Sequence, residues 1–171
     1  IKRIDASSTL SALTGPELRT IFLGMDQRRD ELLNSSITGK NPFKDIRVRQ
    51  AFYHAIDAEA ISARIMRKQA TPSAVMVSPF LLDNADQFER LAYDPEKAKA
   101  LLAEAGYPEG FEIRIDCPND RYVNDESICQ AVAAMMAKVG VKVNVNAQPK
   151  AQFFAKILAS GGYETSFYLL G

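Results

Sequence analysis

The sequence has few of the residues that build metal and redox sites. Its 171 residues include one histidine, two cysteines and no tryptophan. A structural zinc site needs four cysteine or histidine ligands, so this composition predicts no metal site, and we expect no cofactor. The two cysteines, Cys117 and Cys129, could form a disulfide in an oxidising compartment or remain as two buried thiols.

The sequence also lacks a net charge and a long apolar run. Its 21 basic residues balance its 21 acidic residues, which argues against the electrostatic footprint of a nucleic-acid-binding or anionic-membrane-binding protein. No apolar run approaches the roughly 18 residues that predict a membrane-spanning helix. The first residues, IKRIDASSTL, lack the pattern of a signal peptide. We therefore expect no nucleic-acid partner.

Length and apolar content are sufficient for one domain. Hydrophobic residues make up 47% of the chain, enough for a sizeable core but not for two comfortable domains. The chain begins without methionine and ends in the apolar run SFYLLG. We expect residues 1–171 to form one globular domain that is a piece of a longer protein.

Motifs for phosphate binding and catalysis are absent. Gly39 and Lys40 lack the earlier glycine of a phosphate-binding loop, and neither G-x-S-x-G nor His-Glu-x-x-His occurs. His54 lies within one helical turn of apolar residues and is expected at the edge of the core. The charged residues at 28–31 and 125–126 are expected to be solvated. We therefore expect no catalytic residues and no enzyme.

The apolar periodicity alternates between strand and helix along the chain. Strands are expected at residues 19–26, 111–117, 141–148 and 165–171, the first of them after a Gly15-Pro16 turn. Helices are expected after the capping residues Asp45, Asp57 and Asp94, and at residues 127–140 and 151–160. Residues 70–93 contain Pro72 and Pro79 without a clear period, which predicts an ordered surface loop. This order predicts an α/β fold, with a mixed sheet covered by helices.

The segment NPFKDIRVRQAFYHAID, residues 41–57, combines many charges with a helical pattern. Asp45 is placed to cap a helix, and the apolar residues after it follow the spacing of one buried face. The predicted buried residues are Val48, Ala51, Phe52, Ala55 and Ile56. Arg47 and Arg49 are expected to stay at the solvated side or to tie neighbouring loops.

The loop after the strand at 111–117 is the best candidate for a ligand site. Open α/β sheets usually bind ligands where such loops follow the carboxyl ends of strands. Arg121 offers a donor fork for a carboxylate, Tyr122 an amphipathic wall, and Asn124 or Asp125 a helix cap. Asn119 completes the candidate set of Asn119, Arg121, Tyr122 and Asn124. A purely structural loop is the alternative.

Three stretches together resemble a known family. They are NPFKDIRVRQAFYHAID with the following AEAI, YDPEKAKALLAEAGYPEGFE, and DRYVNDESICQAVAAMMAKVGVKVNVN. In this order they resemble the family 5 extracellular solute-binding proteins of ABC importers, which include the dipeptide-binding and oligopeptide-binding proteins. The first two stretches are the most recognisable motifs of that family.

The resemblance implies a two-lobed periplasmic binding protein of type II, of which this chain is the second, inserted lobe. The terminal YETSFYLLG resembles the strand that returns to the first lobe, ending before a position where relatives often carry tryptophan. Arg121-Tyr122 resembles the Arg-Pro-Tyr of dipeptide-binding members, without the proline, where the arginine pairs with the carboxylate of the peptide. Around Arg47 and Arg49, by contrast, the family motif is mostly structural.

The function implied by the resemblance is solute capture for import. A periplasmic or extracellular, lipid-anchored receptor would deliver a small solute to an ABC permease, and would need the first lobe of the same protein to enclose it. A dipeptide or oligopeptide is the commonest solute, whereas other members carry nickel chelates, opines, sugars or haem. The alternative is the ligand-sensing lobe of a cytosolic transcriptional regulator.

Overall fold

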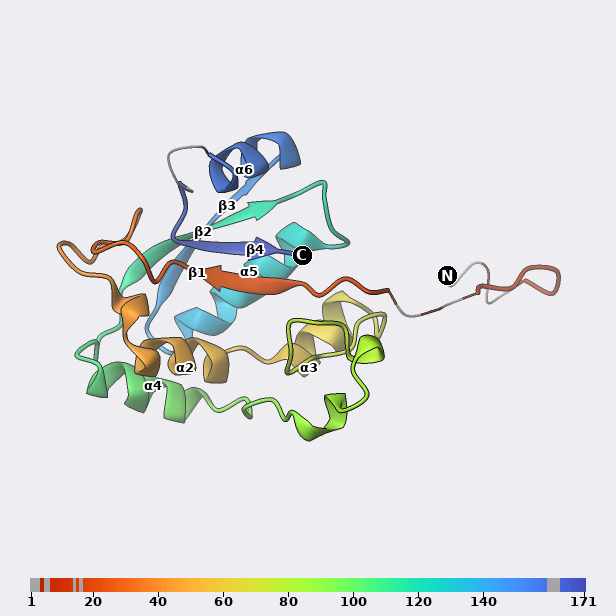
Figure 1. Ribbon diagram of the computed structural model, residues 1–171, viewed down its shortest axis with the longest axis horizontal. Helices are drawn as coiled ribbons and strands as arrows, with labels where there is room; N and C mark the ends of the chain where they lie inside the picture. The colour runs from red at the N-terminus through yellow and green to blue at the C-terminus, as the bar shows by residue number, and fades with distance from the viewer. Residues whose placement is uncertain (1–3, 5–6, 14, 16, 160–163) are drawn as a thin grey trace.

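Four strands form one mixed sheet at the centre of the molecule. The computed structural model describes all residues except 1–3, 5–6, 14, 16 and 160–163. In it the sheet order is β1-β4-β2-β3 (Figure 1). The strands are β1 (Phe22–Met25), β2 (Glu112–Pro118), β3 (Lys142–Gln148) and β4 (Phe167–Leu170). All four predicted strands are confirmed, while Pro16 of the predicted turn and Ser160 of the last predicted helix lie outside the described residues.

The sheet is mixed because its strands are connected in two ways. β2 pairs in parallel with both β3 and β4, and the helices α5 (Asp125–Ala137) and α6 (Lys150–Ile157) make the two crossovers. β1 pairs antiparallel with β4, so that Phe22 lies opposite Leu170. The chain therefore enters and leaves the sheet on neighbouring strands, at one edge (Figure 1).

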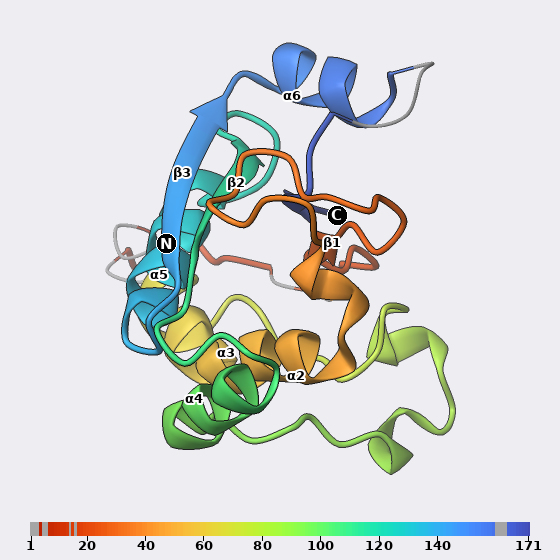
Figure 2. The same cartoon turned by 90° about the vertical axis from the view of Figure 1, so that its left-hand side faces the viewer.

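The remaining helices lie together at one end of the sheet, as Figure 2 shows. α2 (Ile46–Ala55) packs along α4 (Pro95–Glu104), and a 3-10 turn, η1 (Pro42–Lys44), precedes α2. α3 (Ala58–Ala60) continues as a π-helix, η2 (Ile61–Ile65). Two short 3-10 turns, η3 (Pro79–Leu81) and η4 (Ala85–Gln87), interrupt the surface loop. None of the described helices is long and apolar enough to cross a bilayer.

The three predicted aspartate caps are confirmed. Asp45, Asp57 and Asp94 accept hydrogen bonds from backbone N–H groups in the first turns that follow them, at 2.8, 2.8 and 2.9 Å. These bonds satisfy donors that have no partner within the helix. The helix after Asp57 differs from the expectation in its second half, because the Met66 N–H reaches back to the Ile61 carbonyl and widens the turn.

Arg47 and Arg49 tie neighbouring segments together, one of the two roles that the sequence left open. The Arg47 guanidinium donates to the Glu104 carbonyl at 2.8 Å, and the Arg49 guanidinium donates to the Phe43 carbonyl at 2.6 Å. The charges of the 41–57 segment thus satisfy carbonyls and the capping carboxylate Asp45. No external anion is needed to explain them.

An aromatic cluster joins α2 to the sheet. The rings of Phe43, Phe52 and Phe167 are fully buried, and the Phe52 ring makes edge-to-face contacts with Phe43 at 5.2 Å and with Phe167 at 5.4 Å between centroids. Since Phe167 begins β4, these contacts join the helical layer to the sheet.

We expect Phe52→Ala to lower the free energy of unfolding by about 3–5 kcal/mol, because it removes a large buried ring and leaves a cavity. Urea denaturation followed by circular dichroism measures this. The matched control is Ile46→Ala on the same helix, where the side chain is exposed and the change should stay within about 0.5 kcal/mol. Equal losses in the two variants would contradict the assignment of Phe52 to the core.

Candidate functional site

The candidate ligand loop, residues 119–124, lies where three parallel strands end. It begins directly after β2 and leads into α5. Because β2, β3 and β4 are parallel, their carboxyl ends meet at the same edge of the sheet. Ligands of open α/β sheets bind at such an edge.

The backbone of this loop is held from several sides. The Asn119 N–H donates to the Gln148 carbonyl at 3.0 Å, and the Asp120 carboxylate accepts from the Lys150 N–H at 2.6 Å. The loop is therefore fastened to the end of β3 and to the first turn of α6. A loop fastened in this way presents its remaining side chains in a fixed geometry.

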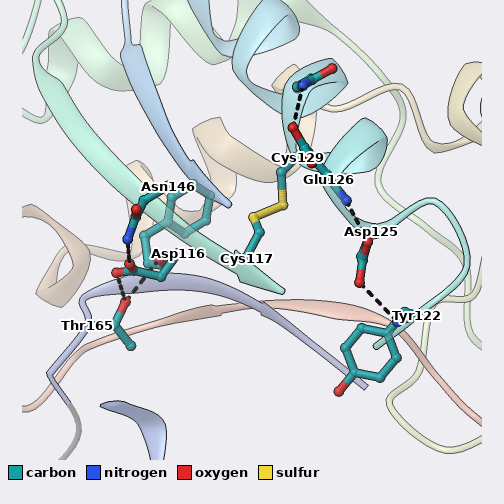
Figure 3. The surroundings of a disulfide bond; sticks show 10 residues. Asp116, Cys117, Tyr122, Asp125, Glu126, Cys129, Asn146 and Thr165 are labelled. Carbon is teal, nitrogen blue, oxygen red and sulfur yellow. Dashed lines mark hydrogen bonds between the residues drawn. A yellow bond between two sulfur atoms is a disulfide. The ribbon is translucent and has the colours of Figure 1, made fainter. Parts of the chain in front are cut away.

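Asp125 holds the second half of the loop. One carboxylate oxygen accepts the Arg121 and Tyr122 N–H groups, each at 3.0 Å, and the other accepts the Glu126 N–H at 2.9 Å. Asp125 begins α5, as the helix-start interpretation has it, but the side chain is buried, so the expectation that it is solvated is wrong. Its position under the loop makes three backbone hydrogen bonds possible, and these offset the cost of burying the charge (Figure 3).

Asn124 has a different role from the predicted helix cap. Its backbone is left-handed, at φ 58°, and its side chain makes no capping bond to α5. Instead, its amide donates to the Ile65 carbonyl at 3.1 Å. Asn124 thus links the loop to the end of η2.

Tyr122 is buried beneath the loop. Its hydroxyl donates to the Gly171 carbonyl at 2.7 Å and accepts from the Gly171 N–H at 3.0 Å. The guanidinium of Arg121 lies 5.1 Å from the centroid of the Tyr122 ring, and that of Arg19 lies 5.5 Å from it. Arg19 was missed by the sequence analysis, because it precedes β1 and only the fold brings it to this loop.

Arg121 and Asn119 are the candidate residues whose side chains stay available. Both are exposed. Within the described part of the chain, the Arg121 guanidinium has no carboxylate partner and the Asn119 amide has no hydrogen bond. A guanidinium without an internal partner, on a fixed loop, is suited to pair with a carboxylate of a ligand.

Cys117 and Cys129 form a disulfide, which settles the alternatives left by the sequence. Both residues are fully buried. The bond joins the end of β2 to α5 and closes a loop around the candidate site (Figure 3).

Asp116 lies next to the disulfide and faces the opposite side of the sheet. Its buried carboxylate accepts from the Asn146 amide at 2.6 Å and the Thr165 hydroxyl at 2.7 Å (Figure 3). Arg114 and Lys156 pair with it, each at 3.2 Å. Burial alone would raise the pKa of Asp116, but these hydrogen bonds and charges hold that pKa below its ordinary value.

The other polar residues considered as sites have structural partners. His54 is buried, with Nδ1 at 2.7 Å from the Ala92 carbonyl, consistent with the expected position against the core. Arg29 pairs with the Asp26 carboxylate at 2.8 Å. Among the described residues, no group of three histidine, cysteine, aspartate or glutamate side chains is placed to hold a metal ion.

The fold and the edge loop define the class of this chain as an α/β lobe of the kind found in periplasmic binding proteins. The family model described as "Bacterial extracellular solute-binding proteins, family 5 Middle" matches residues 1–170. The chain therefore belongs to the family 5 bacterial extracellular solute-binding proteins, and the family predicted from its motifs is confirmed.

Relatives within the family are named for different solutes. Glutathione-binding protein GsiB of Pectobacterium atrosepticum is 33% identical over 168 residues, which cover 98% of this chain and 30% of that protein. Heme-binding protein A of Haemophilus influenzae is 38% identical over 115 residues, which cover 63% of this chain and 20% of that protein. This chain thus spans less than a third of the length of these two relatives.

Solved structures of periplasmic binding proteins have the same fold. The Helicobacter pylori protein DppA in complex with the peptide STSA aligns with a TM-score of 0.71 at 23% identity, over 99% of this chain and 30% of that one. The Agrobacterium tumefaciens protein AgaA in complex with agropinic acid aligns with a TM-score of 0.64 at 29% identity, over 92% of this chain and 31% of that one. The predicted fold class is confirmed.

Replacing both cysteines, in Cys117→Ala/Cys129→Ala, should lower the free energy of unfolding by about 2–4 kcal/mol, because the unfolded chain regains the freedom that the disulfide removes. Urea denaturation with and without dithiothreitol measures this. Reductant should weaken the unmodified protein by a similar amount and leave the double variant unchanged. Insensitivity of the unmodified protein to reductant would contradict the prediction.

Asp116 should make stability depend on pH. Since its folded-state pKa is lowered, its stabilising contribution is present above the unfolded-state value, near pH 4, and is lost as the pH falls through the folded-state value. Asp116→Asn should therefore cost about 2 kcal/mol at pH 7, with a difference from the unmodified protein that shrinks below about pH 4. Urea denaturation at several pH values measures this.

The matched control for that series is Asp83→Asn, at an exposed aspartate of the surface loop. Its free energy of unfolding should stay within about 0.5 kcal/mol of the unmodified protein at every pH. A difference for Asp116→Asn that does not change with pH would show that the charge of the carboxylate is not what stabilises the fold.

Proposed function

We propose that this chain is the second lobe of a two-lobed solute receptor that serves an ABC importer. The observation that carries the proposal is the Arg121 guanidinium, which is exposed and lacks a carboxylate partner among the described residues. It lies on a loop held by Asp120 and Asp125 at the carboxyl edge of the sheet. The solute binds between this edge and the first lobe, and its carboxylate pairs with Arg121 while Asn119 adds a hydrogen bond.

The position of the lobe within a longer receptor has its own support. The chain enters the sheet on β1 and leaves it on β4. The start of β1 and the end of β4 lie side by side, next to the candidate loop. An insertion with both connections at one place is able to rotate as a unit. We infer that residues 1–171 form one domain inserted into the first lobe.

The solute class proposed is a small peptide or another carboxylate. Relatives are named for glutathione and for dipeptides, and every such peptide has a carboxylate that a guanidinium pairs with in a bidentate manner. The receptor binds its solute without catalysis. Ligand favours the closed arrangement of the lobes because it contacts both of them only in that state, and the closed receptor docks on the membrane permease.

The disulfide supports a periplasmic or extracellular location. Cys117 and Cys129 are joined and fully buried, and disulfides persist in oxidising compartments but are rare in the cytosol. The disulfide between Cys117 and Cys129 therefore argues against a cytosolic transcriptional regulator.

The experiment that tests the function uses the full-length receptor purified from its host. Mass spectrometry of solute released by denaturation identifies what it carries, and calorimetric titration with dipeptides, tripeptides and glutathione measures affinity. Retention of a carboxylate-containing solute is expected. A folded receptor that retains no solute and binds none of these compounds would overturn the peptide assignment.

Arg121→Ala should weaken binding of the retained solute by about 10-fold to 100-fold, because a hydrogen-bonded ion pair contributes roughly 1.5–3 kcal/mol. Arg121→Lys should recover only part of this, since it keeps the charge but loses the planar fork. The matched control is Arg28→Ala, at an exposed arginine after the opposite end of β1, which should leave affinity unchanged. Calorimetry at one ionic strength compares the variants, and equal affinity for Arg121→Ala and Arg28→Ala would remove Arg121 from the site.

A further inference from the structure

Three segments that are far apart in the sequence meet at the side chain of Tyr122. They are the candidate ligand loop, the segment before β1 that carries Arg19, and Gly171 after β4. The hydroxyl of Tyr122 exchanges two hydrogen bonds with the backbone of Gly171, at 2.7 and 3.0 Å. The Arg19 guanidinium lies 5.5 Å from the ring centroid.

The two hydroxyl bonds continue the β-sheet pattern by one step. Leu170, the last residue of β4, lies opposite Phe22. For the next residue, Gly171, the Tyr122 hydroxyl bonds both the N–H and the carbonyl, as a neighbouring strand would. Because it both donates to and accepts from the same residue, it fixes the position and the direction of the outgoing chain more tightly than one bond would.

The incoming chain lies against the same point. A Cβ atom built on Gly171 would come within 2.2 Å of the Ile21 side chain and 3.2 Å of the Thr20 carbonyl. The incoming and outgoing segments therefore touch where the Tyr122 hydroxyl holds Gly171. Any change in the angle between these segments and the sheet has to move this contact.

The other end of Tyr122 is joined to the loop that carries Arg121. The backbone N–H groups of Arg121 and Tyr122 share one oxygen of Asp125. The path from Arg121 to Gly171 thus runs through the buried side chain of Tyr122 and through the loop backbone, which the buried carboxylate of Asp125 holds.

We propose that Tyr122 is a positioning residue that couples solute capture at Arg121 to the two strands on which the lobe turns. This inference rests on the proposed function. In this proposal Tyr122 acts through Arg121 and Gly171 rather than on the solute, because its side chain is buried and its hydroxyl is bonded to Gly171. Through its two hydroxyl bonds, it makes the direction of the outgoing strand depend on the position of the loop, so that a solute held by Arg121 also selects the orientation of the lobe.

Tyr122→Phe is the sharpest variant, because it keeps the buried ring and its contacts with both guanidinium groups and removes only the hydroxyl. The matched control is Tyr107→Phe. Tyr107 also packs its ring on a buried aromatic residue, Phe111, and no described residue bonds its hydroxyl. The free energy of unfolding of both variants is measured first, so that folding is established.

Hydrogen–deuterium exchange of the unliganded full-length receptor tests the coupling without any solute. Asp125→Asn, which loosens the loop, should speed exchange in residues 166–171 several-fold, and it should add nothing when Tyr122→Phe is already present. The proposal is overturned if Asp125→Asn speeds exchange in residues 166–171 equally in the receptor with Tyr122 and in the receptor with Tyr122→Phe. It is also overturned if Asp125→Asn does not speed this exchange in the receptor with Tyr122.

Solute binding supplies the second test, with glutathione and the dipeptide Met-Leu as probes. Tyr122→Phe should weaken binding by about 3-fold to 10-fold, the usual effect of removing a hydrogen bond, and by less than about 2-fold in the Arg121→Ala background. Tyr107→Phe should have no effect. A loss for Tyr122→Phe that is the same in both backgrounds would indicate a merely structural role and overturn the coupling.

The two tests separate the two proposals. A receptor that binds neither probe contradicts the peptide assignment, while the exchange experiment still decides the coupling. A receptor that binds a probe with unchanged affinity in Tyr122→Phe keeps the proposed function and overturns the role of Tyr122.

Discussion

The buried carboxylate of Asp116 is the constraint on which the arrangement of this lobe depends. A buried charge is costly without partners, and the partners of Asp116 come from β3, α6 and the segment before β4 as well as from its own strand. These elements satisfy it only when they meet at the end of β2. The next residue, Cys117, points to the other face of the sheet and is bonded to α5. Two successive residues thus hold both layers against the strand from which the candidate loop emerges (Figure 3).

This support fixes the backbone of the candidate ligand loop. The loop starts at the residue after β2 and is fastened again at β3, α6 and α5 through Asn119, Asp120 and Asp125. Its backbone would therefore lose little freedom in the proposed binding of a solute, and the pairing energy of an exposed guanidinium would not be spent on ordering the chain. The exposed polar side chains of the loop therefore project from a backbone that these hydrogen bonds hold in place. Flexible surface loops with the same composition would bind more weakly for this reason.

Local rules predicted the helices and strands, because the residues responsible are neighbours in the sequence. Each of Asp45, Asp57 and Asp94 lies beside the turn that it caps, and the strands show their alternation within a few residues. The ligand-binding role of the loop stays a prediction, and the sequence did not reveal the contacts of its residues. Tyr122 was expected as a wall for ligand, but its hydroxyl bonds to Gly171, and its contact with Arg19 depends on how β1 approaches. Apart from Arg114, the partners of Asp116 are likewise distant in the sequence, and no pattern within one window contains them.

Three arginines can be compared by whether their guanidinium donors already have partners within the protein. This property, rather than the residue type, identifies the candidate ligand residue. Arg47 and Arg49 lie in a conspicuously charged helix start, yet both guanidinium groups donate to backbone carbonyls, and Arg47 also pairs with Asp45. Arg121 comes from a less conspicuous segment, and its guanidinium has only an aromatic ring beside it among the described residues. A contact with an aromatic face orients a guanidinium without using its N–H donors, which project from the edge of the plane. Arg121 therefore lies against a ring with its donors still available, which is what the proposed pairing with a carboxylate requires.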